Sequence, residues 1–305
     1  MIPQGRTETQ HRVIAIVGPT ASGKSGLAIA LAKKLHGEVI SADSRQVYKE
    51  LNIGSGKVTK QEMRGVPHHL LSVTNPKHQY SVAEFVQKAR ATIEAIVARG
   101  HVPIVCGGTG LYVDTLLMEK QIPEVKPNKT LRKRFEKLSV EKLFALLSKK
   151  DPVRAQTIDR HNKVRLVRAL EIIETLGKVP ELQPAKSRYN ILWIGLAPKQ
   201  TELKKKIHTR LHERMKAGML REARTLHAQG LSWKRMEELG LEYRYLARYL
   251  QNKITKIEML EQLENEIWHY TKRQMRWFKR NAEIQWFKTK DTTRIEKISK
   301  KFLIK

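Results

Sequence analysis

The sequence predicts an α/β protein whose core is a parallel β-sheet, with a helical insertion and a helical C-terminal region. In the N-terminal part, short runs rich in β-branched residues alternate with helical segments, which is typical of a parallel sheet. From about residue 123 to residue 184 the apolar residues follow a helical period, and no strand is expected there. After Pro198 almost every segment is again helical.

The predicted elements of the N-terminal part follow one another in a regular order. The run from Arg12 to Val17 is apolar and β-branched, as expected of a buried parallel strand. Ser81 and Glu84 form a capping box, which opens a helix that stops near Gly100, where glycine suits the helix end. In order, we expect a strand over 12–17, a turn over 18–25, a helix over 26–35, and strands over 38–42 and 102–106.

The chain changes character near residue 120, where Pro123 and Pro127 interrupt the sheet pattern. We predict one domain made of residues 1–119 and 188–305, and a basic helical insertion of residues 120–187. The insertion is expected to end in a linker through Pro180 and Pro184.

The C-terminal part is predicted to return to the sheet and then to continue as helices. An apolar strand is expected over 190–196 and a last strand over 283–288. The longest helix, over about 256–280, begins with a capping box after Thr255. The charged tail from Thr289 is expected to be loosely held.

The net charge of this 305-residue chain is +29, far from the balance of an ordinary metabolic enzyme. Such a surplus attracts polyanions, first nucleic acid and second an anionic membrane, although solubility or a lysine-rich composition could also explain it. No apolar run approaches the roughly 20 residues of a membrane helix, and no signal peptide is recognisable. We therefore expect a cytoplasmic protein with no membrane partner.

The single cysteine excludes a disulfide framework and a cysteine-based zinc site. Cys106 lies in an apolar run and is expected to be a small buried residue. The eleven histidines show no convincing metal spacing, and the adjacent His68 and His69 are expected to be structural.

The turn after the first strand carries the strongest motif. Gly18-Pro-Thr-Ala-Ser-Gly-Lys-Ser25 fits the P-loop pattern, with a strand before it and a helix after it. In such a loop the backbone amides and the helix N-terminus bind phosphate, the lysine adds a positive charge, and the serine hydroxyl can hold Mg²⁺. Lys24 and Ser25 take those positions here. The core is therefore P-loop NTPase-like, and kinases, NTPases and diphosphate-consuming transferases all remain open.

Two further segments should reach the same edge of the sheet. Asp43 ends the second strand, and ligands of open α/β sheets bind beyond the carboxyl ends of the strands. Asp43 could be a Mg²⁺ ligand, a general base or a plain turn residue. Gly107-Gly-Thr-Gly110 follows the third strand, where glycines permit close backbone approach and Thr109 offers a hydroxyl.

Basic residues gather on two helical stretches. Arg165 and Arg168 are three apart and share a helix face, which is either an RNA contact or a solvated basic face. The helix near the C-terminus mixes Lys272, Arg273 and Arg276 with aromatic residues, a composition that suits RNA; a structural cation–π pair is the alternative for Trp277. On this helix the residues expected in the core are Ile257, Leu260, Leu263, Ile267 and Tyr270.

Several blocks in order resemble the tRNA dimethylallyltransferases, also called isopentenyl-tRNA or IPP transferases, over about residues 12–287. The order of these blocks is far more specific than the P-loop alone. They are Gly18 to Ser25, Asp43-Ser-Arg-Gln-Val-Tyr48, Asn52-Ile-Gly54, Pro67-His-His-Leu70, Tyr80-Ser-Val-Ala-Glu-Phe85, Gly107-Gly-Thr-Gly-Leu-Tyr112, Arg165-Leu-Val-Arg-Ala-Leu-Glu171 and Lys272-Arg-Gln-Met-Arg-Trp-Phe278.

The resemblance implies transfer of a dimethylallyl group from dimethylallyl diphosphate to N6 of adenosine 37, beside the tRNA anticodon. It implies that Asp43 is the general base, with Thr109 near the reaction centre, Lys24 on the diphosphate, Mg²⁺ as cofactor, and no ATP hydrolysis. The expected diphosphate site is Gly18, Pro19, Thr20, Ala21, Ser22, Gly23, Lys24, Ser25 and Arg210. The expected tRNA site is Asp43, Ser44, Arg45, Gln46, Thr109, Arg132, Val164, Arg165, Leu166, Val167, Arg168, Lys272, Arg273 and Arg276.

The chain also departs from the family pattern. Lys206 replaces an arginine, so Arg210 is the preferred diphosphate clamp, because lysine cannot bind two oxygens as arginine does. Gly240-Leu-Glu-Tyr-Arg-Tyr245 carries extra residues relative to the usual pattern. The rival interpretations are a small-molecule or nucleoside kinase, an enzyme that prenylates free adenine nucleotides, and a non-catalytic RNA-binding protein. We expect a monomer.

Overall fold

A computed structural model describes residues 10–119, 123, 125–180 and 187–304. The chain divides into two compact units: the α/β unit, made of Met1–Glu119 and Lys186–Lys305, and the helical unit, Lys120–Ala185. The polar N-terminal residues 1–9 and the expected linker residue Pro184 lie outside the described residues.

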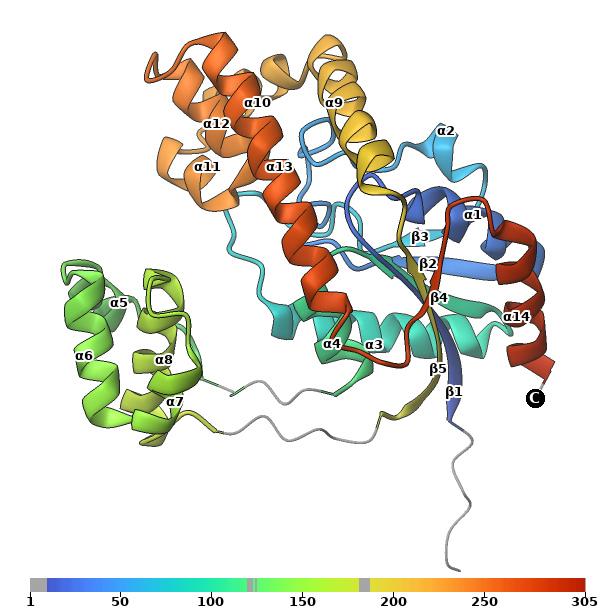
Figure 1. The fold of residues 1–305 in the computed structure, drawn as a ribbon, viewed down its shortest axis with the longest axis horizontal. Coiled ribbons are helices and arrows are strands. Elements are labelled where there is room, and N and C mark those ends of the chain that lie inside the picture. Colours follow the sequence, from blue (N-terminus) through green and yellow to red (C-terminus); the bar gives the residue numbers. More distant parts are fainter. Residues whose placement is uncertain (1–9, 120–122, 124, 181–186, 305) are drawn as a thin grey trace, which may run out of the picture. The chain divides into compact units, whose positions relative to one another are not determined.

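The described residues of the α/β unit form a six-stranded sheet in the order β3-β2-β4-β1-β5-β6, and every neighbouring pair is parallel (Figure 1). At the centre of the sheet, Ile14 of β1 is in register with Ile104 of β4 and with Leu192 of β5. The strands are β1 His11–Val17, β2 Gly37–Ser41, β3 His68–His69, β4 Val102–Gly107, β5 Tyr189–Leu196 and β6 Gln285–Phe287. The expected parallel α/β core is confirmed. The ends of the five predicted strands shift by at most two residues, and the two-residue strand β3 at the edge of the sheet was not predicted.

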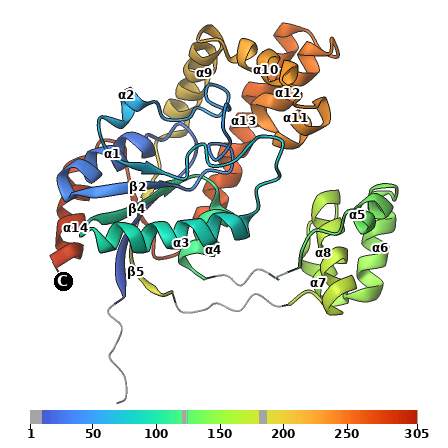
Figure 2. The ribbon, with the colours of Figure 1, turned by 180° about the vertical axis from the view of Figure 1, so that it is seen from behind.

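Both faces of the sheet are covered, which explains why its strands are almost uniformly apolar. Along β1, Ile14 and Ile16 join the core beneath α1 and α14, whereas Val13, Ala15 and Val17 face the core shared with α3, α4 and the C-terminal helices. Figure 2 shows α3 lying along its face of the sheet. These helices are α1 Lys24–Leu35, α3 Val82–Ala98, α4 Gly110–Leu117 and α14 Thr292–Ile304; the short α2 spans Lys60–Met63.

Local capping signals set the start of two long helices, as the sequence predicts. Ser81 caps α3 and Thr255 caps α13, and in both capping boxes the glutamate three residues later returns a hydrogen bond. The helices of the C-terminal region are α9 Gln200–Lys216, α10 Met219–Ala228, α11 Trp233–Leu239, α12 Leu241–Leu250 and α13 Lys256–Phe278.

Two expectations for the C-terminal region are wrong. Ile257 is 71% exposed, because the buried stripe of α13 begins at Met259 and continues through Leu263 and Ile267. The tail is not loosely held: α14 buries Ile295 completely and packs on α1. Its apolar residues recur at helical spacing, a pattern that the abundant charges of the tail obscured.

The helical unit has a small core of its own. It contains Phe135, Leu143, Leu147, Leu166 and Leu170, none more than 1% exposed. Within the described part of this unit the elements are α5 Lys129–Glu136, α6 Val140–Lys150, α7 Pro152–Thr157 and α8 Lys163–Leu176. The prediction of a strand-free, helical region is therefore confirmed for those residues.

The histidine pair and the cysteine are structural, as expected. His69 hydrogen-bonds through Nε2 to the buried carboxylate of Glu38 at 2.6 Å, while Nδ1 of His68 contacts the carbonyl of Val66. Burial raises the pKa of Cys106 to about 11, so its thiol stays protonated. Within the described ranges, no helix combines the length and the apolarity needed to cross a bilayer.

Candidate functional site

The phosphate loop joins β1 to α1 in a backbone conformation that requires glycine. Gly18 has φ 143° and Gly23 has φ 91°, both in the region that other residues avoid. A Cβ on Gly18 would lie only 2.7 Å from the carbonyl oxygen of Leu196 in β5. The loop can therefore fold tightly at the carboxyl end of β1, where its amides and the positive end of α1 favour an anion.

Lys24, the first residue of α1, carries a cation that lacks a strong anionic partner. Its ammonium donates to the carbonyl oxygen of Pro19 at 2.6 Å. Burial lowers the pKa of Lys24 to about 8; Asp43 opposes this shift and the Arg210 guanidinium adds to it. A phosphate group bound here would supply the missing negative charge.

Ser25 follows Lys24 in the first turn of α1, and its side chain is exposed. Mg²⁺ in proteins commonly takes one or two protein oxygens and completes its shell with phosphate oxygens and water. The hydroxyl of Ser25 fits that requirement, so the loop has a suitable protein ligand for a diphosphate-bound Mg²⁺.

Asp43 follows β2 at the same edge of the sheet as the phosphate loop. Its Oδ1 accepts hydrogen bonds from the backbone amides of Arg45, at 2.8 Å, and Gln46, at 3.3 Å. Within the described residues Oδ2 accepts none, so one oxygen holds the turn while the other is open to a substrate. Since Asp43 also acts on the pKa of Lys24, the sheet brings the predicted base and the predicted diphosphate lysine together.

The neighbours of Asp43 surround its turn. Arg45 donates through Nη1 to the carbonyl of Ser44, and Gln46 donates through Nε2 to the carbonyl of Gly56. The amide of Ser44 donates to Oγ1 of Thr109 at 3.0 Å. The structure thus unites the predicted residues after β2 with the predicted threonine after β4.

The glycine-rich turn after β4 is packed too closely for side chains. A Cβ on Gly107 would lie 2.1 Å from the carbonyl oxygen of Ala42, and a Cβ on Gly110 would lie 2.1 Å from the Trp277 ring. Gln274 of α13 fastens this turn to the phosphate loop: it donates to the carbonyl of Gly108 and accepts from the amide of Thr20, each at 2.8 Å. Sequence reasoning did not identify this role of Gln274.

Two other residues of the site were missed or misplaced. Tyr270, expected in the core, lies near Thr109, and burial followed by the Asp43 charge raises the pKa of its hydroxyl to about 12. Burial lowers the pKa of Lys57 to about 8, against the opposing influence of Glu222 and Asp43. The sequence gives no local signal that either residue lies near Asp43, because Tyr270 has the spacing of a core residue on its helix and Lys57 is a single lysine in a loop.

Arg210 lies on α9 and retains solvent access. The surrounding protein lowers its pKa, and the neighbouring guanidinium of Arg214 acts in the same direction. Arg214 is occupied, because its Nη1 donates to the carbonyl of Gly54 and to the carboxylate of Glu242. Lys206, one turn earlier, is exposed. Of these three cations, Arg210 is the one whose charge also acts on Lys24.

Of the five consecutive residues 164–168 expected to contact tRNA, some lie on the surface of the helical unit and others lie in its core. Val164 and Arg165 are exposed, whereas Leu166 and Val167 are buried in the helical core, so their side chains cannot reach RNA. The helical period accounts for this correction: a continuous five-residue block must turn part of itself inward. Arg168, the last of the block, hydrogen-bonds Glu171 at 2.6 Å.

Arg132 shares that partner: its guanidinium binds both oxygens of the Glu171 carboxylate, each at 3.0 Å. Glu171 is fully buried. Burial alone would raise the pKa of Glu171, but hydrogen bonds from Arg132 and Arg168 outweigh it and lower that pKa. Both predicted tRNA-binding arginines therefore already hold a carboxylate.

The basic face of α13 is exposed. Lys272, Arg273 and Arg276 all point away from the buried stripe of the helix. Trp277 donates through Nε1 to Asp114 at 3.0 Å, and the Arg280 guanidinium lies 4.1 Å from the centre of its ring. These contacts support the cation–π interpretation for Trp277.

Family profiles match most of the chain. The profile described as IPP transferase matches residues 46–281, and that described as isopentenyl transferase matches residues 11–79. The tRNA dimethylallyltransferase of Anoxybacillus flavithermus is 37% identical, over 94% of this chain and 93% of its own length. That of Geobacillus kaustophilus is 39% identical, over 95% and 96%.

Solved structures show the same relationship. The full-length tRNA isopentenylpyrophosphate transferase of Bacillus halodurans is 34% identical, with a TM-score of 0.74 over 96% of this chain and 97% of its own. A eukaryotic dimethylallyltransferase acting on tRNA is 27% identical, with a TM-score of 0.82 over 96% of this chain and 79% of its own.

Proposed function

This chain belongs to the IPP transferase family, and on that basis we propose that it is a tRNA dimethylallyltransferase. The reaction moves a dimethylallyl group from dimethylallyl diphosphate to N6 of adenosine 37 in tRNA and releases diphosphate. The observation that carries this proposal is that Asp43, with one open carboxylate oxygen, lies at the phosphate-loop edge of the sheet, near enough for its charge to act on Lys24. A base beside a diphosphate site is what transfer of an allyl group to an amine requires.

The leaving diphosphate is assigned to the phosphate loop. We assign Lys24 and Arg210 to stabilising its growing negative charge; Lys24 is buried and also feels the charge of Arg210, so an anion is favourable there. The amides of the loop add hydrogen bonds without reorganisation. Mg²⁺, held through Ser25 when bound, supplies Lewis-acid stabilisation of the diphosphate oxygens.

The acceptor adenine is assigned to the side of Asp43. Its Oδ1 is held by two backbone amides, which orients the carboxylate, and Oδ2 is free to take the proton of the attacking amine. We assign Ser44, Arg45, Gln46 and Thr109 to holding the adenine beside it. Tyr270, which lies near Thr109 and whose pKa is raised in part by the Asp43 charge, is assigned to the same wall of the site.

The tRNA is assigned to exposed basic residues. On α13 these are Lys272, Arg273 and Arg276, and in the helical unit Arg165. Taking the adenosine out of its stack costs a few kcal/mol, which contacts to the phosphate backbone offset. A net charge of +29 supplies the attraction, so tRNA affinity should fall steeply as salt concentration rises.

The kinase alternative shares the phosphate loop but is not favoured. The relatives that match nearly the whole chain are named transferases acting on tRNA. A kinase acting on a small molecule also has no need for the exposed basic face of α13. We further propose that the protein works as a cytoplasmic monomer, because a strong net charge opposes self-association.

The direct test is incubation of the protein with labelled dimethylallyl diphosphate and a tRNA that carries adenosine 37. Label should enter this RNA, and a matched tRNA with guanosine at position 37 should remain unlabelled. A parallel reaction with ATP and small acceptors should yield no phosphorylated product. Absence of label from both RNAs would contradict the proposed function.

A further inference from the structure

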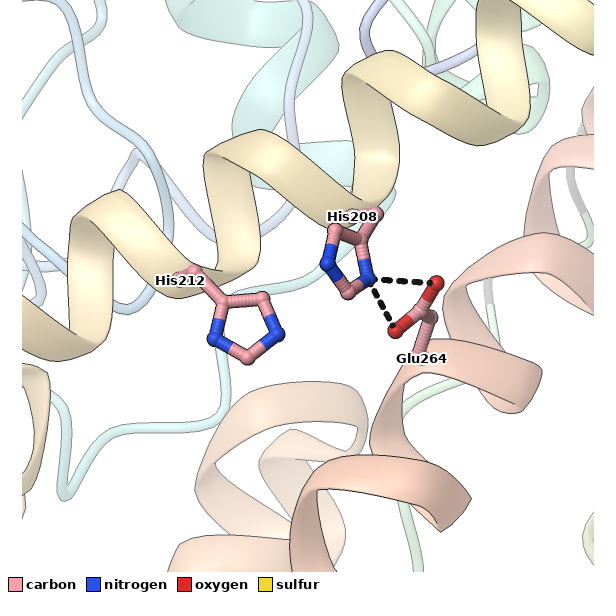
Figure 3. A group of neighbouring side chains, drawn as sticks. All are labelled: His208, His212 and Glu264. Carbon is pink, nitrogen blue, oxygen red and sulfur yellow. Dashed lines mark hydrogen bonds and ion pairs between the residues drawn. The ribbon is translucent and has the colours of Figure 1, made fainter.

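Two histidines and a glutamate meet away from the groups assigned to catalysis. His208 and His212 are four residues apart on α9, so both imidazoles lie on one face of the helix. Figure 3 shows Glu264 of α13 facing them. One potential ligand atom from each residue lies within 4.8 Å of the other two. Sequence spacing alone missed this group, because its third member comes from another helix.

The distances are close to those of a coordinated ion. Nδ1 of His208 lies 3.2 and 3.0 Å from the two carboxylate oxygens of Glu264. Nitrogen and oxygen ligands at about 2.0–2.2 Å around a tetrahedral Zn²⁺ are separated by roughly 3.3 Å. His208 and Glu264 already have that spacing. The centroid of the His212 ring lies 4.4 Å from that of His208, and a nitrogen of this ring lies within 4.8 Å of the other two ligand atoms.

The chemistry of the three groups selects the kind of ion. Imidazole suits Zn²⁺, Cu²⁺ and Ni²⁺, whereas Mg²⁺ prefers six oxygens. We propose that His208, His212 and Glu264 bind one Zn²⁺-type divalent ion, with water in the fourth position, and that this ion joins α9 to α13.

Other histidine–carboxylate pairs lack the third ligand and serve as internal controls. His11 contacts Glu94 at 3.0 Å, and His78 contacts Glu84 at 2.8 Å, each on the surface. In the described residues, the group on α9 and α13 is the one that brings three such ligands together.

Glu38 also receives two histidines, His69 at 2.6 Å and His101 at 2.7 Å, but the Arg99 guanidinium binds both oxygens of that buried carboxylate and supplies its countercharge. Among the described residues no arginine binds Glu264, and this distinguishes the group on α9 and α13.

An ion here would join the two helices that carry much of the site. Arg210 lies on α9 between the two histidines, and α13 carries Tyr270 and Gln274. Metal binding would therefore hold α9 against α13 through coordination bonds in place of the His208–Glu264 hydrogen bonds. This inference is independent of the reaction proposed above, since it rests on the ligand set alone.

The test is titration of Zn²⁺ into the full chain, free of any polyhistidine tag, near neutral pH. The expected result is one ion per chain, with affinity reduced at least tenfold in His212→Ala and in Glu264→Gln. His11→Ala, the matched control, should bind like the wild type. Zn²⁺ should raise the Tm of the wild type and of the control, and should leave the Tm of the two site variants unchanged.

Three results would overturn the proposal. One is equal Zn²⁺ affinity in the wild type, His212→Ala and Glu264→Gln, all folded by circular dichroism. Another is loss of binding in His11→Ala alone. The third is a Tm increase with Mg²⁺ as large as that with Zn²⁺, because oxygen-seeking ions do not select imidazole ligands. Circular dichroism of each variant separates loss of ligand binding from loss of fold.

Discussion

The α/β unit and the helical unit each place a carboxylate among cations, but the two carboxylates differ in how many of their oxygens have hydrogen-bond partners within the protein. In the helical unit, Glu171 is fully buried and receives both guanidiniums of Arg132 and Arg168 together with the amide of Asn128. In the α/β unit, Asp43 uses one oxygen for two backbone amides and leaves the other open among the described residues. The protein itself supplies hydrogen-bond donors to both oxygens of Glu171, whereas one oxygen of Asp43 remains available to a ligand.

The basic residues of the two units differ in the same way: within the described part of the chain, those near Asp43 lack a carboxylate partner, and those near Glu171 have one. Burial, together with the charge of Arg210, lowers the pKa of Lys24, so holding Lys24 protonated costs folding free energy. Arg132 and Arg168 instead hold a carboxylate whose pKa is lowered by them. In this comparison the uncompensated cation Lys24 indicates a binding site, whereas the paired Arg132 and Arg168 stabilise the fold.

The largest expected effect concerns the open carboxylate. Asp43→Asn should keep the hydrogen bonds to the turn but remove the base, lowering kcat by roughly 10²–10⁴-fold while tRNA binding persists. Asp43→Ala should lose the same activity and, in addition, about 1 kcal/mol of stability through the lost hydrogen bonds to the amides of the turn. Single-turnover transfer and tRNA filter binding measure the two quantities. Full activity of the Asn variant would rule out Asp43 as the base.

The satisfied carboxylate should behave in the opposite way. Glu171→Ala leaves two arginines without their partner and should destabilise the protein by about 3–5 kcal/mol, measured by urea unfolding. Glu174→Ala is the matched control, since Glu174 forms a surface pair with Lys150 worth at most about 1 kcal/mol. Equal losses in the two variants would show that burial of Glu171 contributes nothing to stability.

A smaller effect is expected on α9. Arg210→Ala should raise KM for dimethylallyl diphosphate by about 10- to 100-fold, because a charged hydrogen bond contributes about 1.5–3 kcal/mol. Lys206→Ala, one turn away, should change KM little. If the lysine variant suffers the greater loss, the diphosphate clamp lies at Lys206 and our assignment of Arg210 is wrong.

The smallest effect is a dependence of diphosphate affinity on pH. Because the pKa of Lys24 is lowered to about 8, the protonated form that binds an anion is lost as pH rises above that value. Inorganic diphosphate should bind about tenfold more weakly for each pH unit above about 8, until the pKa of the bound form is reached. Calorimetry across this range measures it.

Lys57 also has a pKa of about 8 and could produce the same profile. The Lys24→Arg variant separates the two, since arginine stays protonated and should flatten the curve if Lys24 is responsible. Lys57→Met should leave the slope in place. An unchanged slope in Lys24→Arg would assign the titration to another group.

Much of the site could be predicted because its signals are local. The strand before Gly18, the glycines of the loop and the lysine that opens α1 lie within one short window, and each is required by the conformation there. Asp43 and Gly107-Gly-Thr-Gly110 could be placed at the same edge because parallel strands end together. The capping boxes at Ser81 and Thr255 are equally local.

What the sequence could not supply are contacts between distant residues. Gln274 meets Thr20 and Gly108, more than 160 positions away, and Tyr270 meets Thr109. Nothing in a helical period distinguishes these from core residues. The same reason explains why the predicted burial of Ile257 and the predicted exposure of α14, Leu166 and Val167 differ from the structure. Whether a helix face is buried depends on which distant element packs against it.

By itself, then, the sequence determined five of the strands, the helical character of the insertion and of the C-terminal region, the phosphate loop and the basic character of the chain, because each depends on neighbouring residues or on total composition. Only the tertiary structure decided which charges are compensated. Glu171 meets Arg132 across 39 positions and Glu264 meets His208 across 56, and such pairs form only when packing brings two helices together.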